Sequence, residues 1–363
     1  MAQSFHMIEY IHESPRSLAD TLRENAIEVE KIVTIARSRQ ITKMVLAGLG
    51  SSFTAGMMAL PLCQKYCGLY TMVLQANDLD LHIGRFIDEH TLVVMVSRSG
   101  ERGGVVESLL AARKRGAMGV AITAVADSLL AQNAEITLLT REGPEITFPK
   151  TKSVTACAGL MMAIGLAFAS PADQEAQKKV YALRGLGTSI QENVESLEKD
   201  MAAIFPFIQD HEILSVTGTG SNFGVALEAA IKVQEAAYII TRGDSTAGML
   251  HGPSGAVDKR WLVMSLVLPS DVAITRELLG LIRKFGANSL AVVTPGVDLD
   301  DVADHILRIQ NTPDPYLASL AFLPAVQLLA YQWAVARDLD PDSPKAMRAV
   351  LDAILPSGRE EPD

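Results

Sequence analysis

The sequence repeats itself at one constant spacing. The segment KMVLAGLGSSF at 43–53 returns as EILSVTGTGSNF at 212–223, with Gly48 matching Gly218 at an offset of 170 residues. Several matches in one register predict two related domains in tandem. Three further pairs match at the same offset: Leu92 with Leu262, Gly116 with Gly286, and Ile136 with Ile306.

Short apolar runs alternate with helical segments in each half. Short apolar runs bounded by turn residues are typical of buried strands, whereas 104–115 and 276–285 have helical spacing. This alternation predicts an α/β fold with a doubly wound parallel sheet in each of two tandem domains. We place the domains at 1–180 and 181–363, with the join in a charged helical stretch. The expected strands are 44–47, 92–96, 119–122, 136–139, 213–216, 262–268, 289–293 and 306–309, and the expected flanking helices are 18–39, 172–200 and 315–337.

The composition argues against several classes of function. A formal net charge of -10 gives no general attraction to nucleic acid, so we expect no nucleic-acid partner. The longest apolar stretch, 159–169, is too short to span a membrane, and the first residues do not resemble a signal peptide. Cys63, Cys67 and Cys157 do not form the pattern of a disulfide framework or a metal site. We therefore expect a cytoplasmic protein with no metal and no membrane partner.

The loop after the first strand is glycine-rich. In an open parallel sheet, ligands bind beyond the carboxyl ends of the strands. Gly50 lets the backbone approach an anion closely, while Ser51 and Ser52 add hydroxyl donors at the start of a helix. The same residues also suit a simple strand-to-helix turn with a serine cap, so that both interpretations stay open.

A second loop, at 97–102, combines hydroxyl and basic side chains. Ser97 and Ser99 flank Arg98, and Arg102 follows at the expected start of a helix. Guanidinium groups bind phosphate or carboxylate in a bidentate way, so this loop is a second candidate anion site. The alternative is a capped helix start with solvated arginines.

A third loop, at 144–153, precedes a strongly apolar helix. It carries Lys150 and Thr151, and a loop in this place can close over a ligand. The alternative is a connector whose lysines face water.

A predicted helix and a predicted turn carry candidate acid–base residues. Glu228, Lys232 and Glu235 stand at i, i+4 and i+7, so they share one helix face. They form either a solvated salt-bridge stripe or a carboxylate base held beside a lysine. His251 precedes Gly-Pro and is therefore expected in a turn, where it is either incidental or a proton carrier.

Together these segments resemble the sugar isomerase (SIS) family over roughly residues 40–350. Its members include sugar-phosphate isomerases, amino-sugar-phosphate deaminases and deglycases of phosphorylated Amadori compounds. The motifs that carry the resemblance are Gly50-Ser51-Ser52, S-x-S-G-E at 97–101, E-I-x-x-x-x-T-K at 145–152, E-A-A-I-K-x-x-E at 228–235 and H-G-P at 251–253.

The resemblance implies a role for each motif. Glu235 is expected to move a proton between C1 and C2 of a sugar phosphate, with Lys232 contacting the substrate and His251 opening the sugar ring. In family dimers this histidine enters the site of the partner subunit, so a homodimer is expected. The resemblance implies that Gly50, Ser51, Ser52, Ser97 and Ser99 bind the sugar phosphate, and this chemistry requires no cofactor. Further candidate substrate-binding residues in the same segments are Arg98, Arg102, Lys150, Thr151 and Glu228.

The sequence departs from the family at several of these positions. Arg102 replaces a threonine, Lys150 replaces a small residue, and no lysine precedes His251. The active-site lysine near the family's C-terminus is Ala349 here, with Lys345 and Arg348 as nearby basic residues. The chain starts MAQSF, without the nucleophilic cysteine of a glutaminase domain, so we expect no use of glutamine. The added cations favour a more anionic substrate than a plain hexose phosphate.

Three hypotheses follow from these observations. The first is an isomerase/deaminase that releases ammonia from a hexosamine 6-phosphate. The second is a deglycase of a phosphorylated fructosamine, with basic residues that hold an amino-acid carboxylate. The third is a sensor that binds sugar phosphate without turnover.

Overall fold

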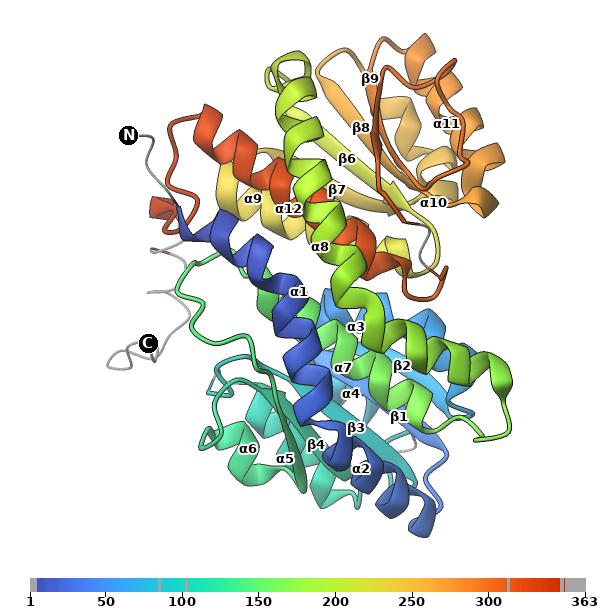
Figure 1. Cartoon of the computed structure of the whole chain (residues 1–363). Helices are drawn as coiled ribbons and strands as arrows, with labels where there is room; N and C mark the ends of the chain where they lie inside the picture. Colours follow the sequence, from blue (N-terminus) through green and yellow to red (C-terminus); the bar gives the residue numbers. More distant parts are fainter. Residues whose placement is uncertain (1–4, 84–85, 102–103, 312–313, 347–348, 350–363) are drawn as a thin grey trace. The chain divides into compact units, whose positions relative to one another are not determined.

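Two parallel sheets of five strands each form the framework of the protein (Figure 1). The structure is a computed structural model that describes residues 5–83, 86–101, 104–311, 314–346 and 349. Glu13–Glu145 and Lys152–Gly187 form an N-terminal unit, while the described residues of 5–12, 146–151 and 188–349 form a C-terminal unit. The domain limits expected from the sequence stay a prediction, because helix α8 (Gln174–Ile208) continues through the proposed join.

The N-terminal sheet has the strand order β2-β1-β3-β4-β5. Gly48 at the end of β1 pairs with Gln75 of β2 and with Val96 of β3, so the three strands end at the same edge. Helix α7 packs on α3. The strands are β1 (Lys43–Gly48), β2 (Tyr70–Gln75), β3 (Thr91–Val96), β4 (Met118–Thr123) and β5 (Ile136–Leu139), and the helices are α2 (Ala26–Ser38), α3 (Ser51–Tyr66), η1 (Ala76–Asp78), α4 (Leu79–His82), α5 (Val105–Lys114), α6 (Leu129–Asn133) and α7 (Lys152–Ala167).

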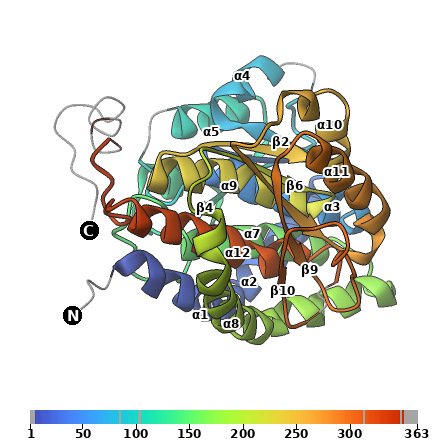
Figure 2. The same cartoon turned by 90° about the horizontal axis from the view of Figure 1, so that it is seen from above.

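The C-terminal sheet repeats this order as β7-β6-β8-β9-β10. Gly218 of β6 pairs with Ser245 of β7 and Leu266 of β8, which reproduces the N-terminal register. Helices α9 and α12 lie side by side (Figure 2). The strands are β6 (Ile213–Gly218), β7 (Ile240–Ser245), β8 (Trp261–Val267), β9 (Asn288–Val293) and β10 (His305–Arg308), and the helices are α9 (Ser221–Ala237), α10 (Thr246–Leu250), η2 (Pro253–Ala256), η3 (Pro269–Asp271), α11 (Val272–Lys284) and α12 (Ala318–Ala336).

The structure confirms the duplicated α/β fold and every strand that the sequence predicted, and it adds β2 and β7. Both added strands begin exposed and stay half-buried along most of their length. Because each pairs on one side only, neither needs the continuous apolar run of a central strand. The Arg-Gly-Asp stretch within β7 hides that strand from a search for apolar residues.

The N-terminal helical segment begins earlier than predicted and is broken. The sequence favoured one helix over 18–39, whereas the structure has α1 (His6–Glu24) and then α2. Asn25 separates them, because its side chain donates to the carbonyls of Thr21 and Leu139 at 2.8 Å each and accepts from the N–H of Leu139 at 2.9 Å. These bonds hold the junction between α1 and α2 against the end of β5.

Helix α12 is long and apolar enough to cross a membrane by length and composition, and it exceeds the apolar stretch at 159–169. However, 83% of its most apolar window is buried inside the protein, as in the core helix of a globular domain. The three cysteines are also buried and free.

Candidate functional site

The loop after β1 turns sharply into α3. Gly50 has φ +54° and ψ −126°, a conformation that favours glycine. A Cβ on Gly48 would lie 2.6 Å from the Cβ of Ser52, so the strand end and the helix start are too close for a side chain there. Ser51 and Ser52 are half-buried in the first turn of α3. The predicted turn therefore places two hydroxyls and a helix N-terminus at the carboxyl edge of the sheet.

The second loop leaves the same edge from β3. The hydroxyl of Ser97 accepts from the N–H of Gly100 at 3.2 Å, and its own N–H donates to the carbonyl of Ile122 at 3.0 Å. Gly100 has φ +65°, and a Cβ there would lie 2.3 Å from the hydroxyl oxygen of Ser128. The hydroxyl of half-buried Ser99 accepts from the N–H of Glu101 at 3.5 Å. These bonds fix the main chain of the loop in one conformation.

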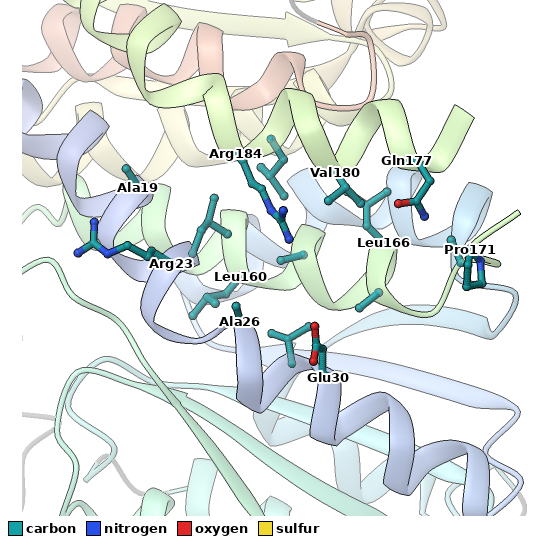
Figure 3. Close-up of a pocket in the computed structure, with 16 residues that line it drawn as sticks. Ala19, Arg23, Ala26, Glu30, Leu160, Leu166, Pro171, Gln177, Val180 and Arg184 are labelled. Carbon is teal, nitrogen blue, oxygen red and sulfur yellow. The ribbon is translucent and has the colours of Figure 1, made fainter. Parts of the chain in front are cut away.

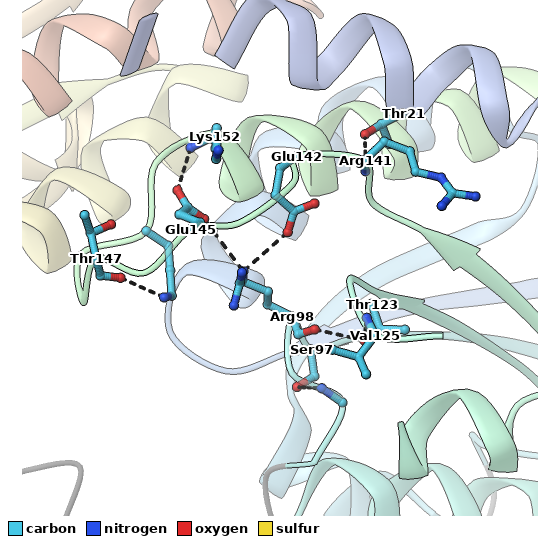
Figure 4. A network of polar contacts seen from close by, with 12 residues as sticks. Thr21, Ser97, Arg98, Thr123, Val125, Arg141, Glu142, Glu145, Thr147 and Lys152 are labelled. Carbon is cyan, nitrogen blue, oxygen red and sulfur yellow. Dashed lines mark hydrogen bonds and ion pairs between the residues drawn. The ribbon is translucent and has the colours of Figure 1, made fainter. Parts of the chain in front are cut away.

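Arg98 turns toward two buried carboxylates (Figure 4). Its Nε lies 3.4 Å from Oε1 of Glu142 and 3.9 Å from Oε2 of Glu145, and both glutamate side chains are fully buried. Burial raises the pKa of Glu142, and the nearby charge of Glu145 adds to this rise against the opposing charge of Arg98. The solvated arginine that the sequence left open is therefore wrong for Arg98.

The start of α7 joins the same set of charges. The N–H of Lys152 donates to Oε1 of Glu145 at 2.9 Å (Figure 4). The buried ammonium of Lys152 lies 2.5 Å from a carboxylate oxygen of Glu13. The sequence analysis missed Glu13 and Glu142. The signal for Glu142 was its place directly after a strand at the carboxyl edge, where Glu145 was already singled out.

The third loop is anchored within the C-terminal unit. Its Phe148 N–H donates to the carbonyl of Asp342 at 2.8 Å, and Gln327 donates to the carbonyl of buried Thr151 at 3.3 Å. Lys150 donates to the carbonyl of Thr147 at 2.7 Å within the loop itself. The loop is therefore held by several hydrogen bonds, unlike the alternative of a connector whose lysines face water.

Helix α9 carries a buried ion-pair cluster. The ammonium of Lys232 contacts a carboxylate oxygen of Glu235 and lies 3.7 Å from Oε1 of Glu228. The side chains of Lys232 and Glu228 are 1% and 0% exposed, whereas that of Glu235 is 22% exposed. The alternative of a solvated salt-bridge stripe is therefore wrong. One carboxylate, Glu235, reaches the surface beside a buried ammonium.

His251 lies in a turn, as the sequence predicted, and its side chain is exposed. It ends α10, which follows the carboxyl end of β7. Glu235 lies near the C-terminal end of α9, about 20 Å along the helix from its start at the carboxyl edge. The fold therefore sets His251 and Glu235 of this chain toward opposite edges of the C-terminal sheet.

Two basic residues from the sequence analysis, Arg102 and Arg348, lie outside the described residues. Lys345 and Ala349 are exposed. The N–H of Ala346 donates to the hydroxyl of Tyr238 at 3.1 Å, which fixes the start of the C-terminal segment beside the end of α9.

The sequence matches the SIS domain twice, at residues 38–170 and 207–337. These matches cover well over half of the chain and coincide with its two sheets. The chain belongs to the SIS family. Its two domains are tandem copies, as the repeat predicted.

Known proteins resemble this SIS protein along most of its length. Glutamine–fructose-6-phosphate aminotransferase (isomerizing) of Symbiobacterium thermophilum is 30% identical over an alignment of 354 residues, which covers 93% of this chain and 57% of that protein. The chain thus spans little more than half the length of such relatives. The C-terminal domain of glucosamine-fructose-6-phosphate aminotransferase from Francisella tularensis has a TM-score of 0.83 at 24% identity, covering 94% of this chain and 99% of that one. Glucosamine-6-phosphate deaminase of Thermotoga maritima has a TM-score of 0.75 at 21% identity, covering 93% and 97%.

A cavity of about 700 Å³ in this SIS protein lies away from these motifs (Figure 3). Apolar side chains of α1, α2, α7 and α8 form most of its wall, with Arg184 and Glu30 among the few polar ones. It contains none of the predicted site residues. Among the described residues no group of three or more His, Cys, Asp or Glu side chains is arranged to hold a metal ion.

Proposed function

We propose that this SIS protein is an isomerase/deaminase of hexosamine 6-phosphates. The buried cluster on α9 is the observation that carries the proposal. Burying a lysine and a glutamate costs desolvation free energy. Because α9 buries both beside one accessible carboxylate, we infer that this carboxylate has a function.

Glu235 is the proposed base. It removes the proton from C2 of the open-chain amino sugar and returns it to C1, while the nitrogen loses a proton and the aldehyde oxygen O1 gains one, so that the C2 amine becomes an imine and C1 a hydroxymethyl group. Water then adds to the imine and ammonia leaves, so that a ketose phosphate remains. Lys232 cannot act as a free base, because its ammonium is held between two carboxylates; it orients Glu235 and supplies positive charge to the substrate oxygens.

The loops at Gly50 and Ser97 are the proposed phosphate anchor. Both leave the carboxyl edge of the N-terminal sheet with a serine hydroxyl, a rigid glycine and the start of a helix. Phosphate binding far from the reacting carbons provides orientation for the proton transfer.

The test is ligand-dependent melting with a panel of sugar phosphates, followed by an ammonia assay on each stabilising compound. We expect glucosamine 6-phosphate or a stereoisomer to raise Tm and to be consumed with release of one ammonia per ketose phosphate. Stabilisation by every hexosamine 6-phosphate without ammonia release would exclude deamination and leave isomerisation, deglycation or sensing.

The deglycase hypothesis has lost part of its support. It relied on added cations that hold a carboxylate, but the ammonium of Lys150 is bonded to its own loop. Fructosamine 6-phosphates of amino acids therefore enter the panel as the second class of compound.

We further propose a homodimer in which His251 serves the site of the partner. The exposure of His251 and its separation from Glu235 along the C-terminal sheet support this arrangement. Equal amounts of Glu235→Gln and His251→Ala subunits, refolded together, should recover about a quarter of wild-type activity, since half of the random dimers contain one intact site. Recovery of no activity, with mixed dimers present on native gels, would contradict the shared site.

A further inference from the structure

The buried side of Arg98 is the least expected part of the N-terminal unit. Two carboxylates with fully buried side chains, Glu142 and Glu145, face one guanidinium nitrogen at 3.4 and 3.9 Å. They come from the segment after β5, whereas Arg98 follows β3, so the contact joins two loops of the same sheet edge.

The guanidinium group is held from one side only. Its Nε is buried and faces the two carboxylates at ion-pair distance without a hydrogen bond, yet the side chain as a whole is 24% exposed. Within the part of the chain that the structure describes, Nη1 and Nη2 make no hydrogen bond. The terminal nitrogens of Arg98 therefore remain available beside the serine loop.

The main chain at this position is fixed as well. The carbonyl of Arg98 accepts from the hydroxyl of Thr123 at 2.9 Å and from the N–H of Ala124 at 3.0 Å. With the backbone fixed by these bonds and Nε at ion-pair distance from two buried carboxylates, little conformational freedom is left for the side chain to lose on binding.

We propose that Glu142 and Glu145 are positioning residues that hold Arg98 so that its terminal nitrogens bind an oxyanion of the substrate. The inference rests on the proposed function of the Ser97–Gly100 loop and adds a specificity element to it. Phosphate and carboxylate share the geometry that a guanidinium fork recognises, so either group of a substrate can be the oxyanion.

The experiment measures dissociation constants of inorganic phosphate, glucosamine 6-phosphate and a carboxylate-bearing fructosamine 6-phosphate. Wild type is compared with Arg98→Ala, Glu142→Gln and the double variant. Arg98→Ala and Glu142→Gln should each weaken binding about tenfold, and the double variant should bind no more weakly than Arg98→Ala, because Glu142 acts through Arg98. Arg98→Lys should not restore affinity, since it keeps the charge but loses the fork.

Two features make the outcome specific. Arg141→Ala is the matched control, because Arg141 is the neighbour of Glu142 in sequence but pairs with Glu24 at 2.9 Å. The kcat of Glu142→Gln at saturating substrate should stay within about twofold of wild type, whereas a general structural defect would lower it. If Glu142→Gln does not fold, Glu145→Gln takes its place.

The results for the three ligands and the variants distinguish failure of this inference from failure of the proposed function. A larger loss for the fructosamine phosphate alone assigns the fork to a carboxylate, and an equal loss for all three ligands assigns it to phosphate. Unchanged affinity in Glu142→Gln, or additive losses in the double variant, would overturn the inference while leaving the proposed function intact. A wild type that binds inorganic phosphate but no sugar phosphate would instead contradict the proposed function.

Discussion

Helices α3 and α9 occupy the same position in the two domains but bury different chemistry. At the offset of 170 residues, Met58 and Leu62 of α3 correspond to Glu228 and Lys232 of α9. All four side chains are at most 1% exposed. Since one copy of the fold buries two apolar side chains where the other buries an ion pair, the fold itself does not need the charges.

The loops differ in the opposite sense. Gly50 and Gly220 have nearly identical conformations, with φ +54° and +58° and ψ −126° and −125°. The next loop carries Ser97 and Ser99 in the N-terminal domain, but the equivalent positions are Val267 and Pro269. The candidate anion-binding side chains therefore occur on one copy of the scaffold and the candidate acid–base side chains on the other, which is the division expected when a duplicated domain specialises.

The strongest test of this division is removal of the accessible carboxylate. Glu235→Gln should lower kcat by about 10²–10⁴-fold, the range typical of a general base, while ligand-induced melting shifts are retained. Lys65→Gln alters the equivalent position of α3 and is the matched control, with an expected change below about twofold. Turnover that survives in Glu235→Gln would remove the case for acid–base chemistry on α9 and favour the sensor.

Stability provides the next test. Lys232→Leu leaves Glu228 buried with its cation removed, and should lower the free energy of unfolding by about 3–5 kcal/mol. The double variant Glu228→Met/Lys232→Leu, which copies α3, should be between neutral and about 4 kcal/mol more stable than wild type, yet inactive. Urea denaturation measures both.

The relative stability of these two variants tests whether α9 needs its charges for folding. A double variant that is less stable than Lys232→Leu alone would show that α9 needs its charges for folding, and the comparison with α3 would fail. An active double variant would contradict the role proposed for Lys232.

The loops give a smaller effect. Ser99→Ala removes one hydroxyl from the proposed phosphate anchor, and should raise KM for the sugar phosphate about tenfold with little change in kcat, since a hydrogen bond to a charged group contributes about 1.5–3 kcal/mol. Ser270→Ala, in the equivalent loop of the other domain, should leave KM unchanged. Equal effects of both variants would show that the two loops are not specialised as proposed.

Sequence patterns were sufficient for the duplicated fold because repeats, glycine turns and apolar central strands are local signals. The same patterns missed β7, whose strand is set by pairing with β6 rather than by its own residues. They also could not tell whether Glu228 and Lys232 are solvated, because i, i+4 spacing is the same on a buried face. The partners of Arg98 come from a segment more than 40 residues away, and only the folded sheet brings them together.

The smallest predicted effect compares one buried acid in each domain. Burial raises the pKa of both Glu142 and Asp271. Asp271 accepts hydrogen bonds from the hydroxyl of Ser270 at 3.0 Å and the N–H of Leu268 at 3.4 Å, whereas neither oxygen of Glu142 has a hydrogen-bond partner. A raised pKa means that the folded protein holds this proton more tightly than the unfolded chain does. The stability contributed by the bound proton is therefore complete below the usual glutamate pKa and is lost as pH rises through the raised value.

Glu142→Gln should therefore melt close to wild type at pH 4 and on the order of 1–3 °C above it at pH 8. Asp271→Asn should melt below wild type at both values, because the amide no longer accepts both bonds. A Glu142→Gln difference that does not change with pH would mean that Glu142 keeps its charge in the folded protein and that Arg98 compensates its burial fully.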